Sequence, residues 1–139
     1  RKPPLPITND NLDFYSIIDS LRSNWSVADE TNRLNYLEHF KQSCEKYLQK
    51  IRTQYLSPSH ELEFHQVLHT FLTSILDLLS YLTSSNLDIS IKIKLVLSTC
   101  LGWLIKHAQV IYCKRNFKTI CTVFKNILRN GQSNNRQLA

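Results

Sequence analysis

Glycine is almost absent from this chain. Only two glycines, Gly102 and Gly131, occur among its 139 residues, where average usage of about 7% would give roughly ten. Glycine supplies the positive φ angles and the close backbone approach that phosphate-binding loops, dinucleotide-binding folds and nucleophile elbows require. So few glycines exclude those sites and favour long helices joined by short turns.

Apolar residues recur every three or four positions in the first half of the chain, as in amphipathic helices. The first helix is predicted to begin at Asn9 or Asp10 and to end near Ser23, and Ser26 is the predicted N-cap of a second, long helix. The apolar stripe of that second helix is Leu34, Leu37, Phe40, Cys44, Tyr47, Leu48, Ile51 and Tyr55.

A third helix is predicted after Ser57-Pro58, because serine is a good N-cap and proline suits the first helical position. Its apolar face is wide, which indicates a central helix with neighbours on more than one side. The apolar residues that we assign to it are Leu62, Phe64, Val67, Leu68, Phe71, Leu72, Ile75, Leu78, Leu79 and Leu82.

Residues 87–97 are ambiguous, because their apolar and polar side chains alternate as in a strand but also fit a helical stripe. A single strand would have no partner in this sequence, so we predict a helix. We expect Gly102, inside it, to allow a close helix–helix approach near Trp103. A helix from 88 to 130 would be ~65 Å long, so we predict a break near Arg115-Asn116 and a last helix that ends at Gly131.

The sequence therefore predicts an all-α fold of four to five antiparallel helices, as a helical bundle or a short α-solenoid segment. We expect an extended, Pro-rich linker at residues 1–9, a single all-α domain at 10–131 and a polar, flexible tail at 132–139.

Charge is unevenly distributed along the chain. All eleven Asp and Glu lie in residues 1–88, whereas residues 89–139 hold nine Lys and Arg and no acid. Counted as positions of one helix, Lys114 is followed by basic residues at offsets of 4, 11 and 15, which share one face. That face lies largely opposite Phe117, Ile120, Phe124 and Ile127. The basic residues that we expect to bind a partner are Lys114, Arg115, Lys118, Lys125, Arg129, Lys92 and Lys106.

The favoured hypothesis is a non-enzymatic protein–protein interaction or scaffold module of a larger intracellular protein, with the nucleus favoured over the cytoplasm. A groove between helices would take an acidic or amphipathic protein segment, and the basic face would steer it. The alternative is nucleic-acid binding through the last helix. A second alternative is a secreted four-helix, cytokine-like protein with two disulfides and a glycan at Asn24. The basic face is also compatible with a solvated surface that has no partner.

Other candidate sites carry less signal. Glu61, His65 and His69 step by four along one helix face, but Gln66 stands where a zinc protease needs its glutamate, so we expect no metal and no cofactor. Trp25 and Trp103 either cover the core or mark an interface. No catalytic set is present, so no enzyme is predicted.

The four cysteines form no Cys-x-x-Cys pair, and Cys44 and Cys100 fall on apolar stripes. We therefore expect reduced thiols. No run of about 18 apolar residues occurs, so we expect no membrane span. The oligomeric state stays open.

Overall fold

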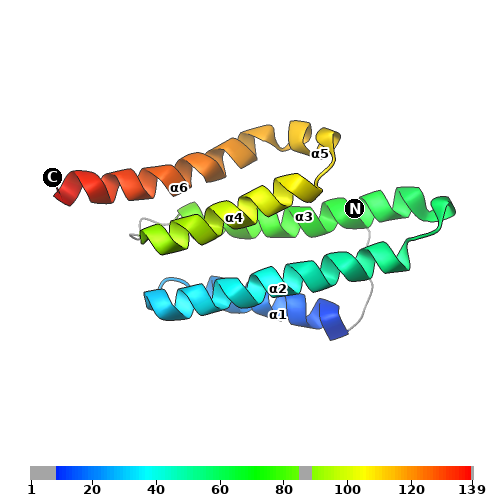
Figure 1. Ribbon diagram of the computed structural model, residues 1–139, viewed down its shortest axis with the longest axis horizontal. Helices are drawn as coiled ribbons and strands as arrows, with labels where there is room; N and C mark the ends of the chain where they lie inside the picture. The colour runs from blue at the N-terminus through cyan, green and yellow to red at the C-terminus, as the bar shows by residue number, and fades with distance from the viewer. Residues whose placement is uncertain (1–8, 85–88, 139) are drawn as a thin grey trace.

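The computed structural model describes residues 9–84 and 89–138, with side chains from Phe14 to Arg129. Within these ranges every regular element is helical, which confirms the all-α prediction, and the helices pack as a bundle (Figure 1). Most of the predicted linker lies outside the described residues. The elements are α1 (Asn9–Asn24), α2 (Glu30–Gln54), the 3₁₀ turn η1 (Pro58–His60), α3 (Glu61–Ser84), α4 (Ile91–His107), α5 (Val110–Arg115) and α6 (Phe117–Leu138).

Helix α3 is the centre of the bundle, as its wide apolar face predicts. It packs against α1, α2, α4 and α6, and ten of its 24 residues are buried. Among the described residues, the segment Pro58–Ser84 is long and apolar enough to cross a membrane by length and composition alone. More than half of its most apolar window is buried inside the bundle, so packing against four helices accounts for its apolar character.

The start of α3 differs from the prediction. Ser57 has N-cap backbone angles but caps nothing with its side chain; its Oγ lies 2.9 Å from Ser59 Oγ instead. The first turn after Pro58 is therefore a 3₁₀ turn, and α3 begins only at Glu61. Leu62, predicted to be in the core, is 68% exposed because this first turn of α3 extends past the packed part of the bundle.

The corner between α1 and α2 is fixed by Trp25 and Arg33. Trp25 is buried, and its backbone carbonyl accepts a 2.8 Å hydrogen bond from Arg33 Nε, whose guanidinium lies 5.0 Å from the indole centroid. The chain continues as a turn after Trp25, so Ser26 does not cap α2 as predicted. Asp29 is the N-cap, and its carboxylate accepts from Asn32 N at 2.9 Å, since an anion is favoured at a helix N-terminus.

Helix α4 confirms the helical interpretation from Ile91 onward. Ser90 is its N-cap, and the Ser90 hydroxyl accepts a hydrogen bond from Ile93 N at 3.3 Å. The predicted role of Gly102 is wrong: a Cβ added there would meet nothing within 4 Å. Gly102 is exposed, whereas the adjacent Leu101 is buried, so the glycine lies on the outer face of α4 and no helix approaches it.

The chain breaks twice between α4 and α6. The predicted break is confirmed at Asn116, the C-cap of α5. An unpredicted break at Ala108 and Gln109 separates α4 from α5. Tyr112 anchors the short α5 to α3, with its hydroxyl 3.0 Å from Thr73 Oγ1. Helix α6 passes through Gly131, where we expected it to end, and continues to Leu138.

Replacing Arg33 by alanine should destabilise the fold by about 2 kcal/mol, because it removes a charge-assisted hydrogen bond and a cation–π contact and leaves the buried Trp25 carbonyl unpaired. Urea denaturation measures this change in the free energy of unfolding. Arg22 is a matched control, since its guanidinium also lies over a ring, 5.1 Å from the Tyr81 centroid, but at a partly exposed site. Arg22→Ala should cost about 0.5 kcal/mol, and equal losses for the two variants would contradict this account of the corner.

Candidate functional site

The structure distributes the seven predicted basic residues over three helices. Lys118, Lys125 and Arg129 lie on α6, whereas Lys114 and Arg115 belong to α5, so the prediction that Lys114 shares a helix with the others is wrong. The break at Asn116 separates them. The remaining two, Lys92 and Lys106, lie on α4, and all seven side chains are exposed.

Helix α6 presents an exposed apolar row as well as a basic one. Its buried side chains are Ile120, Val123 and Ile127. Phe117 and Phe124, which the sequence pattern groups with Ile120 and Ile127, are 63% and 49% exposed, and Leu128 is 43% exposed. Phe117, Phe124 and Leu128 are separated by seven and four positions, so they form one row next to the buried stripe.

Helix α4 carries a similar exposed row. Ile91, Leu95 and Ile105 are 71%, 63% and 43% exposed and lie near one another around the helix. Cys100 and Trp103 on the other flank of α4 line a cavity shared with α2, while α6 also packs against α4. The exposed row of α4 therefore lies on the flank toward α6.

The two rows border the same face of the molecule. Helices α4 and α6 are neighbours and run antiparallel (Figure 1). Because α6 is a right-handed helix, its exposed row lies beside its buried stripe on the side that is nearer to α4. We call this surface the α4–α6 face; it consists of Ile91, Leu95, Ile105, Phe117, Phe124 and Leu128.

Basic side chains border the α4–α6 face on both sides. On α6 each apolar residue of the row is followed directly by a basic one, as in Phe117-Lys118 and Phe124-Lys125. The same step occurs on α4, in Ile91-Lys92 and Ile105-Lys106. One residue is about 100° around a helix, and the two helices run in opposite directions. On each helix the basic side chain therefore lies on the outer side of the apolar residue that precedes it, so a basic row borders the apolar strip on both sides.

These charges have no counter-ion among the residues that the structure describes. None of the seven basic residues forms an ion pair with any residue that the structure describes. Arg129 donates to the amide oxygen of Asn126, a neutral group. The α4–α6 face is thus an apolar strip between two rows of basic side chains. Their positive electrostatic potential attracts acidic groups near the surface even at physiological salt.

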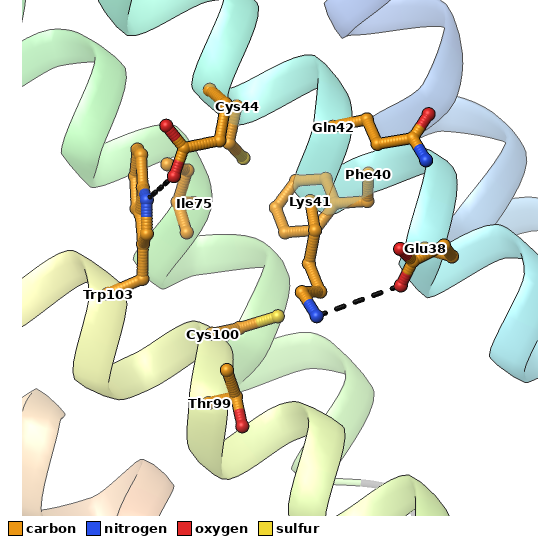
Figure 2. A pocket seen from close by; sticks show the side chains of 10 residues that line it. Glu38, Phe40, Lys41, Gln42, Cys44, Ile75, Thr99, Cys100 and Trp103 are labelled. Carbon is orange, nitrogen blue, oxygen red and sulfur yellow. Dashed lines mark hydrogen bonds and ion pairs between the residues drawn. The ribbon is translucent and has the colours of Figure 1, made fainter.

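The two tryptophans have different environments. Trp25 is 2% exposed and covers the end of the core, so it is not a surface anchor. Trp103 is half-buried, and its indole nitrogen donates to Glu45 Oε1. It lines the cavity between α2 and α4, which measures about 230 Å³ and is shown in Figure 2.

The histidines of α3 are joined by one glutamine. Gln109, at the start of α5, has its Nε2 2.8 Å from His65 Nε2 and its Oε1 3.1 Å from His69 Nε2. The amide N–H donates to His65, and His69 N–H donates to the amide oxygen. Both Nε2 atoms thereby attach α3 to the corner before α5, while Glu61 is exposed. Among the described residues no three His, Cys, Asp or Glu side chains are arranged to hold a metal ion.

All four cysteines are free thiols in the structure, and Cys44 and Cys100 are buried where α2 meets α4. Burial raises the pKa of the Cys100 thiol from 9.0 to about 12. Burial, together with the neighbouring Cys100, also raises the pKa of the Cys44 thiol well above its usual value. Both groups are therefore neutral thiols at physiological pH and poor nucleophiles.

No family model, no curated protein and no solved structure matches this chain. What it does is therefore inferred from its own surfaces. The sequence identified the basic rows but not the apolar strip between them. The signal that it offered is the repeated pairing of an apolar residue with a following lysine or arginine.

The buried thiols should make the fold sensitive to alkaline pH. Their pKa values are higher in the folded than in the unfolded chain, so their contribution to stability is complete below about pH 9 and is lost as the pH rises toward 12. Cys44→Ala/Cys100→Ala should therefore lose less free energy of unfolding between about pH 8 and pH 10.5 than the wild type, measured by urea denaturation.

The matched control replaces Cys113 and Cys121, which are half-buried. This control should keep the part of the wild-type slope that is due to Tyr15, whose pKa burial raises, and should change only the part due to Tyr112, whose pKa is raised by burial and also by Cys113. Identical pH slopes for the two double variants would show that Cys44 and Cys100 do not titrate as described.

Proposed function

We propose that this chain is a non-enzymatic docking module whose α4–α6 face binds an acidic, amphipathic helix of a partner protein. The observation that carries the proposal is the apolar strip of α4 and α6 between two rows of basic side chains that form no ion pair within the described part of the chain. An exposed apolar strip rimmed by charged residues is typical of an interaction site.

The dimensions of the strip suit a short helix. Phe117 and Leu128 are eleven residues apart, which corresponds to about 16 Å or three helical turns. The side chains on the strip are aromatic or branched aliphatic, and on α6 they are spaced i, i+7, i+11, which matches the way an amphipathic helix presents its own apolar face. A partner helix that lies along the strip places its apolar residues between those of α4 and α6.

The charges determine which helix is favoured. Both edges of the strip are basic, through Lys92 and Lys106 on α4 and Lys118, Lys125 and Arg129 on α6. A partner with Asp and Glu on both sides of its apolar face meets an opposite charge at each edge. Complementary charge of this kind speeds association and disfavours basic partners.

Single-stranded nucleic acid is a second candidate ligand. Phe117 and Phe124 are exposed beside Lys118 and Lys125, and bases stack on exposed aromatic side chains within basic grooves. The α4 side of the strip, however, offers Ile91, Leu95 and Ile105, which provide no stacking surface. The aliphatic half of the strip therefore favours a protein partner.

The charge requirement is tested with a labelled synthetic helix of about eighteen residues, roughly five turns, with leucine on one face and glutamate on its flanks. Fluorescence anisotropy should show saturable binding that weakens with added salt. Lys118→Glu/Lys125→Glu should weaken it at least tenfold, a loss of about 1.4 kcal/mol. The matched control Lys46→Glu/Lys50→Glu makes the same charge change on α2, outside the strip. Its affinity for the amphipathic peptide should lie within about twofold of the wild-type affinity.

Two results would overturn the proposal. In one, a scrambled peptide of equal composition binds as tightly as the amphipathic one, which would mean that charge alone is recognised. In the other, the helix does not bind but a labelled single-stranded oligonucleotide does, and its binding is lost in Lys118→Glu/Lys125→Glu. That outcome would assign the surface to nucleic acid.

The apolar requirement is tested by Phe117→Ser/Phe124→Ser. Because both rings are about half exposed or more, the free energy of unfolding should change by no more than about 1 kcal/mol, whereas the amphipathic peptide should bind at least about tenfold more weakly. Leu56→Ser is the control, since Leu56 is 77% exposed between α2 and η1, outside the strip. Unchanged peptide affinity in the phenylalanine variant would exclude the strip as the contact surface.

A further inference from the structure

A cavity lies between α2 and α4, on the flank of α4 that does not form the α4–α6 face. Its volume is about 230 Å³. Figure 2 shows Phe40 and Cys44 of α2, Ile75 of α3, and Cys100 and Trp103 of α4 around it. Three helices therefore contribute to its wall, and the wall is formed mainly by apolar groups.

The size of the cavity sets the size of its occupant. An apolar cavity of about 150 Å³ in another protein stays dry and takes up benzene. A volume of about 230 Å³ therefore has room for a molecule somewhat larger than a single benzene ring, of roughly ten non-hydrogen atoms. The flat ring of Trp103 and the ring of Phe40 offer stacking surfaces to a planar molecule.

The charged groups that line the mouth each have a partner already. Lys41 Nζ lies 3.6 Å from Glu38 Oε2, and Glu45 accepts the hydrogen bond of the Trp103 indole. Figure 2 shows the Lys41–Glu38 pair as a dashed line. The sulfur atoms of Cys44 and Cys100 belong to neutral thiols. An anionic ligand would lie beside a carboxylate, and a cationic ligand would have to displace Lys41 or the Trp103 indole from its partner, so a neutral ligand is favoured.

We propose that the α2–α4 cavity is a binding site for a small, neutral, planar compound of one or two fused rings. The ring system fills the space between Phe40, Ile75 and Trp103, and a single polar atom of the ligand reaches solvent at Thr99, on the rim. The residues that line the cavity are not those of the apolar strip, so this site stands or falls independently of the proposed function.

Indole is a suitable probe because it is neutral, planar and of about the required size. Isothermal titration calorimetry with the wild-type protein should show saturable binding, and the nuclear magnetic resonance signal of the Trp103 Nε1–H group should shift with the same midpoint. Indole-3-acetate, the same ring with a negative charge, should bind at least tenfold more weakly.

Two variants test whether the ligand binds in the cavity. Cys100→Leu enlarges a wall residue and fills the space, and Thr99→Phe blocks the rim. Each should weaken indole binding at least tenfold. Thr99 is exposed, and its hydroxyl bonds only to the Leu95 carbonyl of its own helix, so the rim variant tests the site even if Cys100→Leu fails to fold. The matched control Cys121→Leu makes the same exchange on α6 and should leave indole binding unchanged.

The absence of saturable indole binding to the wild type would overturn the proposal. Wild-type affinity in Thr99→Phe would also overturn it, because the ligand would then bind elsewhere. Indole-3-acetate binding as tightly as indole would refute the preference for a neutral ligand.

Discussion

The burial of α3 is the constraint on which the rest of the structure depends. Its apolar side chains extend around most of the helix, so one neighbouring helix cannot cover them, and α1, α2, α4 and α6 all pack against it. The tightest part of this arrangement is aromatic. Phe71 of α3 lies 5.1 Å from Phe14 of α1 and 4.9 Å from Tyr47 of α2, and Phe14 and Tyr47 stack at 5.3 Å. These three rings hold three helices together, and each pair adds roughly 0.5–1.5 kcal/mol to the stabilisation from burial.

The same constraint explains why an apolar strip stays exposed. The inner side of α6 covers α3 and α4, but no described helix covers the outer side of the α4–α6 pair. On the opposite flank of α4, α2 provides that cover, and the imperfect fit of the two helices leaves the cavity beside Trp103. Burying Ile91, Leu95, Phe117 and Phe124 would be favourable by about 25 cal/mol per Å². A partner that fits the strip gains that energy, whereas an isolated chain does not.

Much of the fold followed from helical periodicity, because a regular stripe such as Leu37–Ile51 leaves one face to bury. Details that depend on tertiary contacts did not follow. Asp29 replaces Ser26 as N-cap because Trp25 enters the core and shifts the start of α2. The α4–α5 break occurs where Gln109 bonds to the histidines of α3. Phe117 and Phe124 fit a core stripe as well as Ile120 does, and the sequence does not record that only one side of α6 has a neighbour. The basic rows could be predicted, whereas the strip between them required the positions of α4 and α6.

Helix α4 forms part of both proposed sites, so its rigidity determines whether they influence each other. Leu97 and Leu104 are fully buried against the core, and Ser90 and the Ala108 break fix the two ends of the helix. These contacts favour a single position of α4, whereas coupling between two sites requires an element with two states that both ligands bias. If both proposals hold, we expect a planar ligand beside Trp103 and a helix on the α4–α6 face to bind without affecting one another. Cooperativity between them would require α4 to tilt, and that movement would expose Leu97 and Leu104 to water.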